Sequence, residues 1–247
     1  MEEGADADAD DVDELETLRL LVPNLELSTG CSPQHLPGNP PSTLAQSLSQ
    51  RLLDLLHSTR LVRAKDLRIL YRTPPLEGED EEVPDAEPSV EVKAYWVLYI
   101  DILFISLDGN AFDTAWLAVL AALKNTRLPR AWWDADVEGM LCSDAVGEAR
   151  ALKLRGLPVP STFAVFDGGK GKGMVGKGGE GRRWVLADAD AFEEGVCRER
   201  VTVVVDEGRV KRLEKSGGVC VGVRGMRETM GMAEGRWEEW RGLLEGV

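Results

Sequence analysis

Leucine positions early in the chain follow the period of an α-helix. Five of them recur at spacings of three and four residues: Leu44, Leu48, Leu52, Leu55 and Leu56. This spacing is typical of an amphipathic helix whose apolar side faces a core. Pro41 precedes the run, and Ser42 or Thr43 can cap a helix with a side-chain oxygen. We therefore predict a helix from about residue 43 to residue 58, followed by a short extended segment at residues 61–70.

The most apolar part of the chain lies in its middle. Residues 94–107 are rich in Tyr, Trp, Val, Ile and Phe, which predicts one long buried strand. Asp108-Gly109-Asn110 supplies a turn, and Asp113 can cap the helix that follows. Residues 114–124 are apolar on every side from Ala115 to Leu123, as expected for a helix inside a packed domain.

The second half of the chain alternates less regularly. We predict strands at residues 161–166 and 184–187, and a hairpin of residues 201–205 and 209–213 around Asp206-Glu207-Gly208. Residues 226–244 form a helix with Trp237, Trp240 and Leu244 on one stripe. Strands and helices mix without a steady βαβ alternation, which favours an α+β fold.

Charge is distributed very unevenly. The formal net charge is -14, from 43 acidic and 29 basic side chains. Residues 1–16 hold nine acids and residues 76–91 hold eight, and neither segment holds a base. Without them, 26 acids face 29 bases, so the rest is neutral to slightly basic and compatible with RNA contact. Blocks of like charge rarely fold. We predict a disordered acidic tail at residues 1–21, and one domain at residues 22–247 with an acidic loop insertion at residues 73–92.

Several classes of protein are excluded by the rest of the composition. The four cysteines lie far apart with no Cys-x-x-Cys pair, which disfavours a zinc ribbon or a disulfide framework. The N-terminus does not have the basic and then apolar pattern of a signal peptide. The apolar run at residues 95–107 contains Asp101 and is too short to cross a bilayer. We expect a soluble intracellular protein without a membrane partner, a metal or a cofactor.

Three segments together resemble the RNase PH-like subunits of the eukaryotic RNA exosome. They are VPNLEL at residues 22–27, YWVLYIDILFISLDGNAFDTAWLAVLAALKNTRLP at residues 95–129, and LPVPSTFAVFDGG at residues 157–169. The resemblance implies an α+β RNase PH-like domain with a mixed sheet packed against helices, here lacking the strands that usually come first. It further implies a place in a hetero-hexameric ring of such chains, with cap subunits and RNA as partners. The expected location is the nucleus and nucleolus, and also the cytoplasm.

The same resemblance identifies where catalysis would take place. Active relatives cleave RNA with inorganic phosphate, and in them a turn reading Asp-Gly-Gly-Thr-Arg holds that anion through Thr and Arg. The matching residues here are Asp108, Gly109, Asn110, Ala111 and Phe112. Ala111 has no hydroxyl group and Phe112 has no charge. Ser161 aligns with the catalytic aspartate, and a hydroxyl group does not serve as a general acid at neutral pH. The sequence therefore predicts a structural subunit with a degenerate site; an active phosphate-dependent 3′-to-5′ exoribonuclease is the alternative.

Other candidate chemistry has weaker support. Six basic residues in two clusters are candidate RNA contacts or ordinary surface charges: Arg60, Arg63, Lys65, Arg68, Lys153 and Arg155. Residues 171–178 nearly match a phosphate-binding P-loop, but Gly178 stands where Ser or Thr would bind magnesium. Asp188, Asp190, Glu193 and Glu194 could suggest a metal site, but their spacing fits no EF-hand loop, and a solvated charged loop explains them better. Trp132, Trp133, Trp237 and Trp240 could form partner interfaces or pack in the core.

Overall fold

The computed structural model describes residues 14–72, 90–167, 183–218 and 221–245. The chain forms two compact units, and each is built from three separate stretches of sequence. The first unit holds Met1–Val22, Val62–Tyr99 and Lys124–Lys153; the second holds Pro23–Leu61, Ile100–Leu123 and Leu154–Val247. Two strands, β1 (Leu21–Leu27) and β4 (Leu98–Phe104), pair with each other and pass from one unit into the other.

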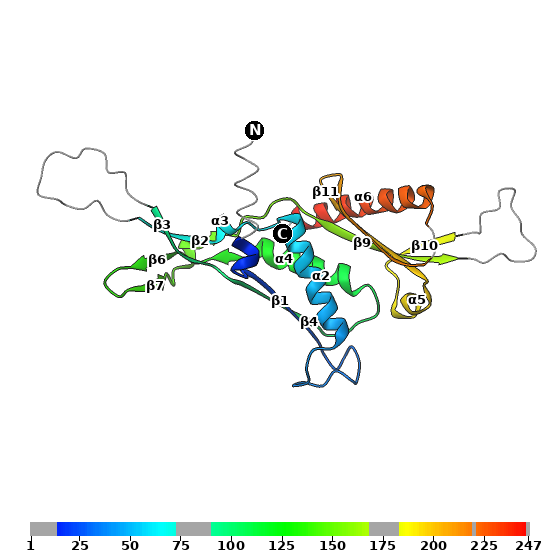
Figure 1. The fold of residues 1–247 in the computed structure, drawn as a ribbon, viewed down its shortest axis with the longest axis horizontal. Helices are drawn as coiled ribbons and strands as arrows, with labels where there is room; N and C mark the ends of the chain where they lie inside the picture. Colours follow the sequence, from blue (N-terminus) through cyan, green and yellow to red (C-terminus); the bar gives the residue numbers. More distant parts are fainter. Residues whose placement is uncertain (1–13, 73–89, 168–182, 219–220, 246–247) are drawn as a thin grey trace, which may run out of the picture. The chain divides into compact units, whose positions relative to one another are not determined.

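Short antiparallel strand pairs make up most of the first unit (Figure 1). β2 (Arg68–Arg72) pairs with β3 (Val90–Tyr95), and β6 (Ala131–Asp134) pairs with β7 (Gly139–Cys142). β5 (Arg127–Leu128) pairs with β8 (Arg150–Ala151). The unit also contains the short helix α3 (Ala64–Leu67) and the 3-10 turn η1 (Val146–Glu148).

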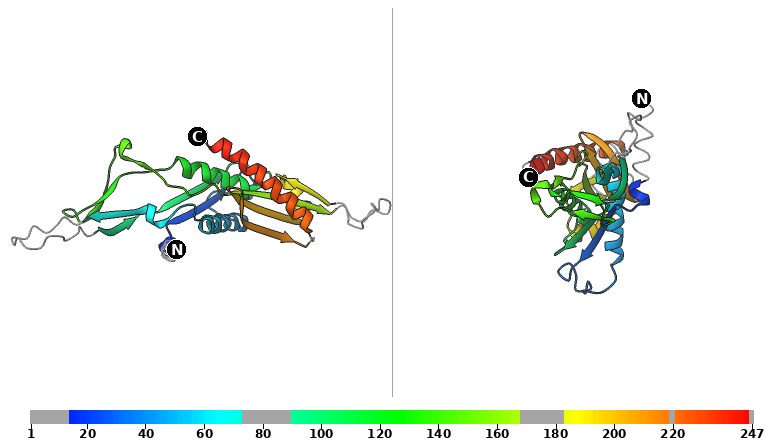
Figure 2. Two further views of the ribbon diagram at one scale, coloured as in Figure 1. Left: turned by 90° about the horizontal axis from the view of Figure 1, so that it is seen from above. Right: turned by 90° about the vertical axis from the view of Figure 1, so that its left-hand side faces the viewer.

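The second unit is built around a four-stranded antiparallel sheet in the order β10-β9-β11-β12. Its strands are β9 (Val159–Asp167), β10 (Arg183–Ala187), β11 (Glu199–Asp206) and β12 (Arg209–Gly217). The long helix α6 (Val223–Glu245) packs along β9 and β11 (Figure 2). Glu207 and Gly208 join β11 to β12 with positive φ angles of 50° and 70°, as a two-residue hairpin turn with the twist of its strands requires.

Helix α2 (Thr43–Thr59) confirms the leucine pattern. The Ser42 side chain accepts a hydrogen bond from the Ala45 N–H at 3.2 Å, which satisfies one free donor of the first turn. Arg60 ends the helix in the left-handed conformation, with φ 52°. The side chains that the spacing placed on the inner face are buried, except for Leu44: the buried ones are Leu48, Leu52, Leu55 and Leu56.

Two tryptophans anchor the helices of the second unit to the start of β9. Trp116 on α4 (Ala111–Asn125) is fully buried, and its indole N–H donates to the Pro158 carbonyl oxygen at 2.6 Å. Trp237 on α6 donates in the same way to the neighbouring Leu157 carbonyl oxygen at 2.8 Å. Trp237 and Trp240 are both buried within the chain, so core packing, rather than a partner interface, explains them.

The expected long strand at residues 94–107 is two strands, which is a correction. β3 ends at Tyr95 because the chain then changes its pairing partner: the Trp96 N–H donates to Leu67, and the Leu98 N–H donates to Leu20, both at 2.8 Å. The strand is also not buried on both faces. Ile100 and Phe104 face inward, whereas alternate side chains are among those that reach the surface: Tyr99, Leu103 and Ile105.

Three further predictions need correction. The segment 61–70 is not extended throughout, because it contains α3 and the buried Ala64 and Leu67. Residues 14–17 are helical and Leu15 and Leu20 are buried, so the disordered tail does not extend to residue 21; residues 1–13 lie outside the described part. The predicted acidic loop at residues 73–92 ends too late, because residues 90–92 belong to β3. Residues 73–89 are not described.

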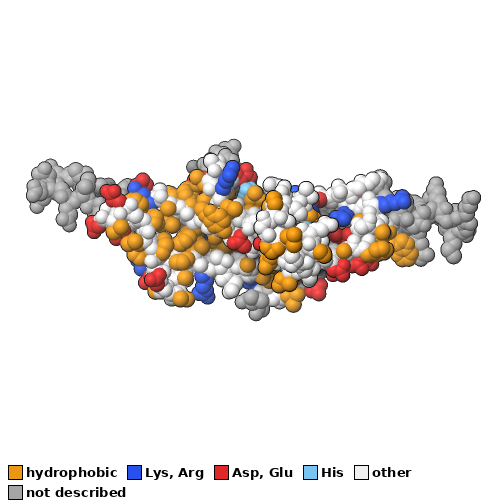
Figure 3. All heavy atoms as spheres, turned by 90° about the horizontal axis from the view of Figure 1, so that it is seen from below, with side chains coloured by type: hydrophobic (Ala, Val, Ile, Leu, Met, Phe, Trp, Pro, Cys, Tyr) orange, Lys and Arg blue, Asp and Glu red, His pale blue; other side chains and the backbone are white. Residues whose placement is uncertain are grey.

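The surface carries both apolar and charged groups. Figure 3 shows apolar side chains exposed on one face, between acidic and basic ones. Large apolar side chains reach the surface from several elements, including Ile105 after β4 and Phe192 on the short helix α5 (Ala191–Val196), each 76% exposed. Within the described ranges, no helix has the length and apolar character needed to cross a membrane.

The anchoring of Trp116 predicts a graded loss of stability. Trp116→Ala should lower the free energy of unfolding by about 3–5 kcal/mol, since a large buried side chain is removed. Trp116→Phe should cost about 1–3 kcal/mol, because most of the packing remains and the Pro158 carbonyl loses its donor. Denaturant unfolding measures both, and the more exposed Trp132→Phe serves as the control. Equal losses for Trp116→Phe and Trp132→Phe would contradict the role assigned to this hydrogen bond.

Candidate functional site

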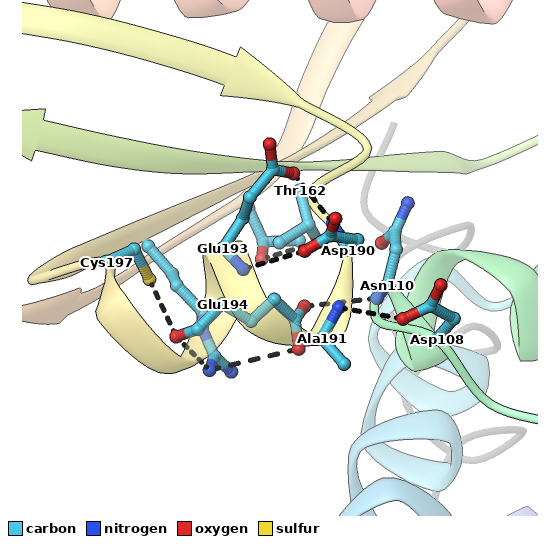
Figure 4. Close-up of polar contacts among 10 residues, drawn as sticks. Asp108, Asn110, Thr162, Asp190, Ala191, Glu193, Glu194 and Cys197 are labelled. Carbon is cyan, nitrogen blue, oxygen red and sulfur yellow. Dashed lines mark hydrogen bonds and ion pairs between the residues drawn. The ribbon is translucent and has the colours of Figure 1, made fainter.

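A cleft of about 520 Å³ lies in the second unit, around the predicted degenerate site. Its walls come from α2, the start of α4, β9, α5 with the residues after it, β11 and β12. Figure 4 shows the corner where α5 meets the turn before α4. The polar lining residues that decide its chemistry are Arg51, Asn110, Thr162, Glu194, Arg198, Glu199, Arg200, Thr202 and Glu214.

The turn before α4 is confirmed, and its geometry explains its glycine. Gly109 has φ +83°, and a Cβ atom at this position would lie 2.3 Å from the Ala189 carbonyl oxygen, so a side chain has neither the conformation nor the space it needs. The Asp108 carboxylate accepts a hydrogen bond from the Ala191 N–H at 3.3 Å. Asp108 therefore joins this turn to the start of α5, in agreement with the prediction that it helps to form the turn.

The N-terminus of α4 is already bound by a carboxylate of the same chain. The Asn110 N–H donates to Glu194 Oε1 at 3.1 Å, and the Asn110 side-chain amide donates to Asp188 Oδ1 at 2.6 Å. A helix N-terminus attracts anions through its free N–H groups and its dipole. Here the N–H of Asn110, directly before the helix, is already paired with Glu194 of the same chain (Figure 4).

Helix α5 positions Glu194 through its cap. The Asp190 carboxylate accepts from the Glu193 N–H at 2.7 Å, and the Glu193 carboxylate accepts from the Asp190 N–H at 2.9 Å, which is a complete capping box. These contacts also account for the acidic residues that could suggest a metal site. In the described part of the chain, no group of three or more His, Cys, Asp or Glu side chains is arranged to hold a metal.

The Arg51 guanidinium is held in the cleft from two sides. It lies 3.9 Å from the centre of the Phe112 ring. Arg51 also pairs with Glu214 at 2.9 Å, and Glu214 pairs with Arg212 at 2.7 Å. Stacking and pairing fix the position of Arg51, while Glu214 shares its single negative charge between two arginines.

Most charged side chains that line the cleft have a partner of opposite charge. The described lining residues include three arginines and three glutamates. Besides the Arg51–Glu214 pair, Arg200 lies 3.9 Å from Glu194, and Lys215 lies 3.2 Å from the fully buried Glu199. Binding a phosphate ion requires uncompensated positive charge or free donors aimed at it, and internal pairs hold most of these groups.

The side chain that faces the cleft from β9 is Thr162, not Ser161. Ser161 is fully buried and does not line the cleft. Thr162 lines it and donates twice to the buried Asp113: from its N–H to Oδ2 at 2.8 Å, and from its hydroxyl to Oδ1 at 2.7 Å. The expected capping role of Asp113 is therefore wrong, because its carboxylate binds β9 instead. Sequence alternation on a strand shows that neighbours face opposite sides, but not which one faces the cleft.

Burial controls the ionisation of Asp113. Loss of solvent raises the pKa of its carboxyl group above the ordinary value of 3.8, and this outweighs the opposing effects of the Thr162 hydrogen bonds and of Arg236, 3.9 Å away. A buried carboxyl group with a raised pKa is less stable as an anion than it would be in water. The contact between α4 and β9 therefore carries a cost at neutral pH.

The predicted RNA-contacting residues divide between the two units. Arg63, Lys65, Arg68 and Lys153 belong to the first, and Arg60 and Arg155 to the second. In the first unit Lys153 lies 3.9 Å from Asp66, between Lys65 and Leu67 in sequence; in the second, the Arg155 N–H donates to Leu61, next to Arg60, at 2.9 Å. Each unit thus brings residues of both sequence clusters together. The near P-loop at residues 171–178 lies outside the described residues.

Comparison with known families assigns the chain to a class. Residues 2–129 match the family described as "3' exoribonuclease family, domain 1" (RNase_PH), which is about half of the chain. The chain belongs to this RNase PH family. Its sequence is 34% identical to exosome complex component rrp43 of Schizosaccharomyces pombe over 81% of this chain and 61% of the relative. It is 32% identical to exosome complex component Rrp42 of Aeropyrum pernix over 80% of this chain and 58% of that relative. The chain thus spans about three fifths of these relatives' length.

Solved structures confirm the fold. The model matches a chain described as "archaeoglobus fulgidus exosome with RNA bound to the active site" with a TM-score of 0.57 at 24% identity, covering 90% of this chain and 69% of the other. An archaeal exosome core matches with a TM-score of 0.56 at 20% identity, covering 92% and 68%. The predicted α+β RNase PH-like fold is therefore confirmed.

The raised pKa of Asp113 predicts a pH-dependent difference in stability. Between pH 3.8 and the folded pKa, the unfolded chain releases this proton and the folded protein keeps it, so wild type loses stability relative to Asp113→Asn as pH rises. Asparagine can accept from the Thr162 N–H and donate to its hydroxyl. Above the folded pKa, the free energy of unfolding of Asp113→Asn should have risen relative to wild type by about 1.4 kcal/mol for each unit by which the pKa is raised.

Urea unfolding of both proteins from pH 3 upward measures this difference. The control is Glu238→Gln, which removes an exposed carboxylate of α6. If the Asp113→Asn variant instead became steadily less stable than wild type as pH rose, the direction assigned to the pKa of Asp113 would be wrong.

Proposed function

We propose that this chain is a non-catalytic, structural subunit of an RNA exosome core ring. In this role it is one member of a hetero-hexameric ring of RNase PH-like chains, in contact with cap subunits and RNA. It supports 3′-to-5′ RNA processing and degradation, including rRNA maturation and mRNA turnover, by scaffolding the ring and guiding RNA. It acts in the nucleus and nucleolus and also in the cytoplasm, and it uses no metal or cofactor.

The relatives support membership of a ring. Both curated relatives are named exosome complex components, and the matched structures are described as archaeal exosomes. The shared fold supplies this chain with the same kind of domain. Rings of similar but non-identical chains require side-by-side contacts of the head-to-tail kind.

One observation carries the proposal that the subunit is not catalytic: a carboxylate of the chain itself binds at the turn before α4, where the resemblance to active relatives would place phosphate. Glu194 accepts from the Asn110 N–H at 3.1 Å. Ala111 and Phe112 supply neither hydroxyl nor charge, and Arg51 is paired with Glu214. Phosphorolysis needs the attacking phosphate ion to be bound and positioned. The internal contacts leave few hydrogen-bond donors in the cleft for that ion.

The proposal predicts no phosphorolysis by the purified chain. Incubation of the chain with single-stranded RNA and inorganic phosphate should release no nucleoside diphosphates, measured by thin-layer chromatography of labelled RNA. The active-enzyme alternative predicts phosphate-dependent release that is lost in Asp108→Ala. Any such release would overturn the non-catalytic assignment while leaving family membership intact.

Ring membership predicts a defined set of partners. A tagged chain expressed in its own cells should co-purify with several other RNase PH-like chains in equal amounts, because a closed ring holds one copy of each. Mass spectrometry of the purified complex identifies and counts them, with the tag alone as control. Recovery of the chain as a monomer, or only with unrelated proteins, would contradict the proposal.

A further inference from the structure

Strand β1 has one side with which no strand of the described chain pairs. β4 pairs with the other side, and these two strands form a sheet of their own (Figure 1). The Ser28 N–H, directly after β1, donates to the Phe104 carbonyl oxygen of β4 at 3.0 Å. Backbone groups of successive residues point to opposite sides of a strand. Leu25 and Leu27 therefore direct their N–H and carbonyl groups away from β4.

The first residue of this side supports the assignment. The Pro23 carbonyl oxygen accepts a hydrogen bond from the Ser49 hydroxyl of α2 at 2.8 Å, and proline has no N–H to satisfy. For Leu25 and Leu27, the described part of the chain supplies no such partner on the side away from β4. We call the backbone N–H and carbonyl groups of Leu25 and Leu27 the β1 edge.

A cleft of about 420 Å³ lies along the β1 edge. Four consecutive residues of β1, 24–27, line it, as expected where the backbone rather than one face of side chains forms the wall. Most residues between 34 and 42 form the opposite wall. This loop makes turns of its own, since the His35 N–H donates to the Ser32 carbonyl oxygen at 3.0 Å. The loop therefore lies beside the β1 edge without pairing with it.

An extended peptide is the ligand that fits the donors and acceptors of the β1 edge. The edge presents N–H and carbonyl groups at every second residue, which is an interval of roughly 7 Å. The backbone of an extended peptide repeats at the same interval. In strand addition of this kind, main-chain hydrogen bonds provide affinity and alternate side chains provide specificity.

The two faces of β1 define the side chains that an added strand needs. Among the described residues that line the cleft, Glu26 carries the one carboxylate, and no lysine or arginine is present. Asn24, on the same face as Glu26, donates to the exposed Asp101 of β4 at 3.3 Å. Leu25 and Leu27 are buried on the other face. A complementary strand therefore has basic residues on one face and apolar residues on the other, in alternation.

We propose that the β1 edge binds an extended segment of another protein, in which basic and apolar residues alternate. The segment pairs with the backbone of Leu25 and Leu27 as a third strand and places its basic side chains beside Glu26. The inference goes beyond the proposed function and does not depend on it. Among the described residues, the cleft along β1 shares no lining residue with the cleft beside α4.

Synthetic peptides test the pairing directly. The probe is a fluorescent peptide of about ten residues in which lysine and valine alternate, and anisotropy measures its binding to the full chain. N-methylation of all valines or of all lysines removes the N–H groups from one or the other side of the peptide. One of these two modified peptides should lose roughly tenfold in affinity, because its hydrogen bonds to the β1 edge are lost. The other should bind like the unmodified peptide.

Charge reversal in the protein tests the side-chain requirement. Glu26→Lys should weaken binding of the unmodified peptide about fivefold, because an exposed ion pair is replaced by repulsion. Glu238→Lys reverses an exposed charge on α6 and should match wild type. Hydrogen exchange measured by NMR locates the peptide: the amides of Leu25 and Leu27 should exchange more slowly in its presence.

Three results would overturn the proposal. The first is equal affinity of the two methylated peptides, or no binding of any peptide. The second is slow exchange of the Leu25 and Leu27 amides in the free chain, because the β1 edge would then already be paired. The third is a dimer of this chain that the peptide dissociates, which would identify a second copy as the occupant. Failure of ring assembly, by contrast, would contradict the proposed function and leave the β1 edge as a peptide site.

Discussion

The contact between Asp113 and Thr162 connects helix α4 to the sheet around which the second unit is built. It joins the first turn of α4 to β9 through two hydrogen bonds to one buried carboxylate. Because Asp113 follows Phe112 directly, the same contact fixes where the turn before α4 enters the cleft, and it holds Thr162 toward that cleft. The Thr162 hydroxyl in turn lies 3.1 Å from the hydroxyl of Thr202 on β11, so two strands and a helix share one buried polar network.

The cleft illustrates how a site can retain its shape and change its electrostatics. The glycine of the turn, the helix N-terminus behind it and a cleft of about 520 Å³ are all present. Two carboxylates of the chain form internal contacts in this cleft. Glu194 binds the N–H directly before α4, and Glu214 pairs with Arg51. These contacts link α5 to the turn before α4 and β12 to α2, so they help to maintain the shape of the domain.

The elements predicted well are those whose signal is local. The leucines of α2, the Ser42 cap and the Glu207-Gly208 turn depend on spacing and backbone conformation, and all were recognisable in the sequence. The break between β3 and β4 was not, because residues 94–100 are uniformly apolar and only the exchange of partner, from Leu67 to Leu20, interrupts the strand. That Thr162 rather than Ser161 faces the cleft was hidden for a similar reason, since alternation does not show which side of a strand faces which way. Glu194 was visible only as one acid among several, because its partner Asn110 lies 84 positions away.

The paired indoles of Trp116 and Trp237 have a consequence for how the molecule opens. They end on two consecutive carbonyl groups, at Pro158 and Leu157, although their helices are far apart in sequence. A fluctuation that moves these two adjoining peptide groups therefore releases both helices together. Amide hydrogens of α4 and α6 should exchange with solvent as a single cooperative unit, even though the two helices are not adjacent in sequence.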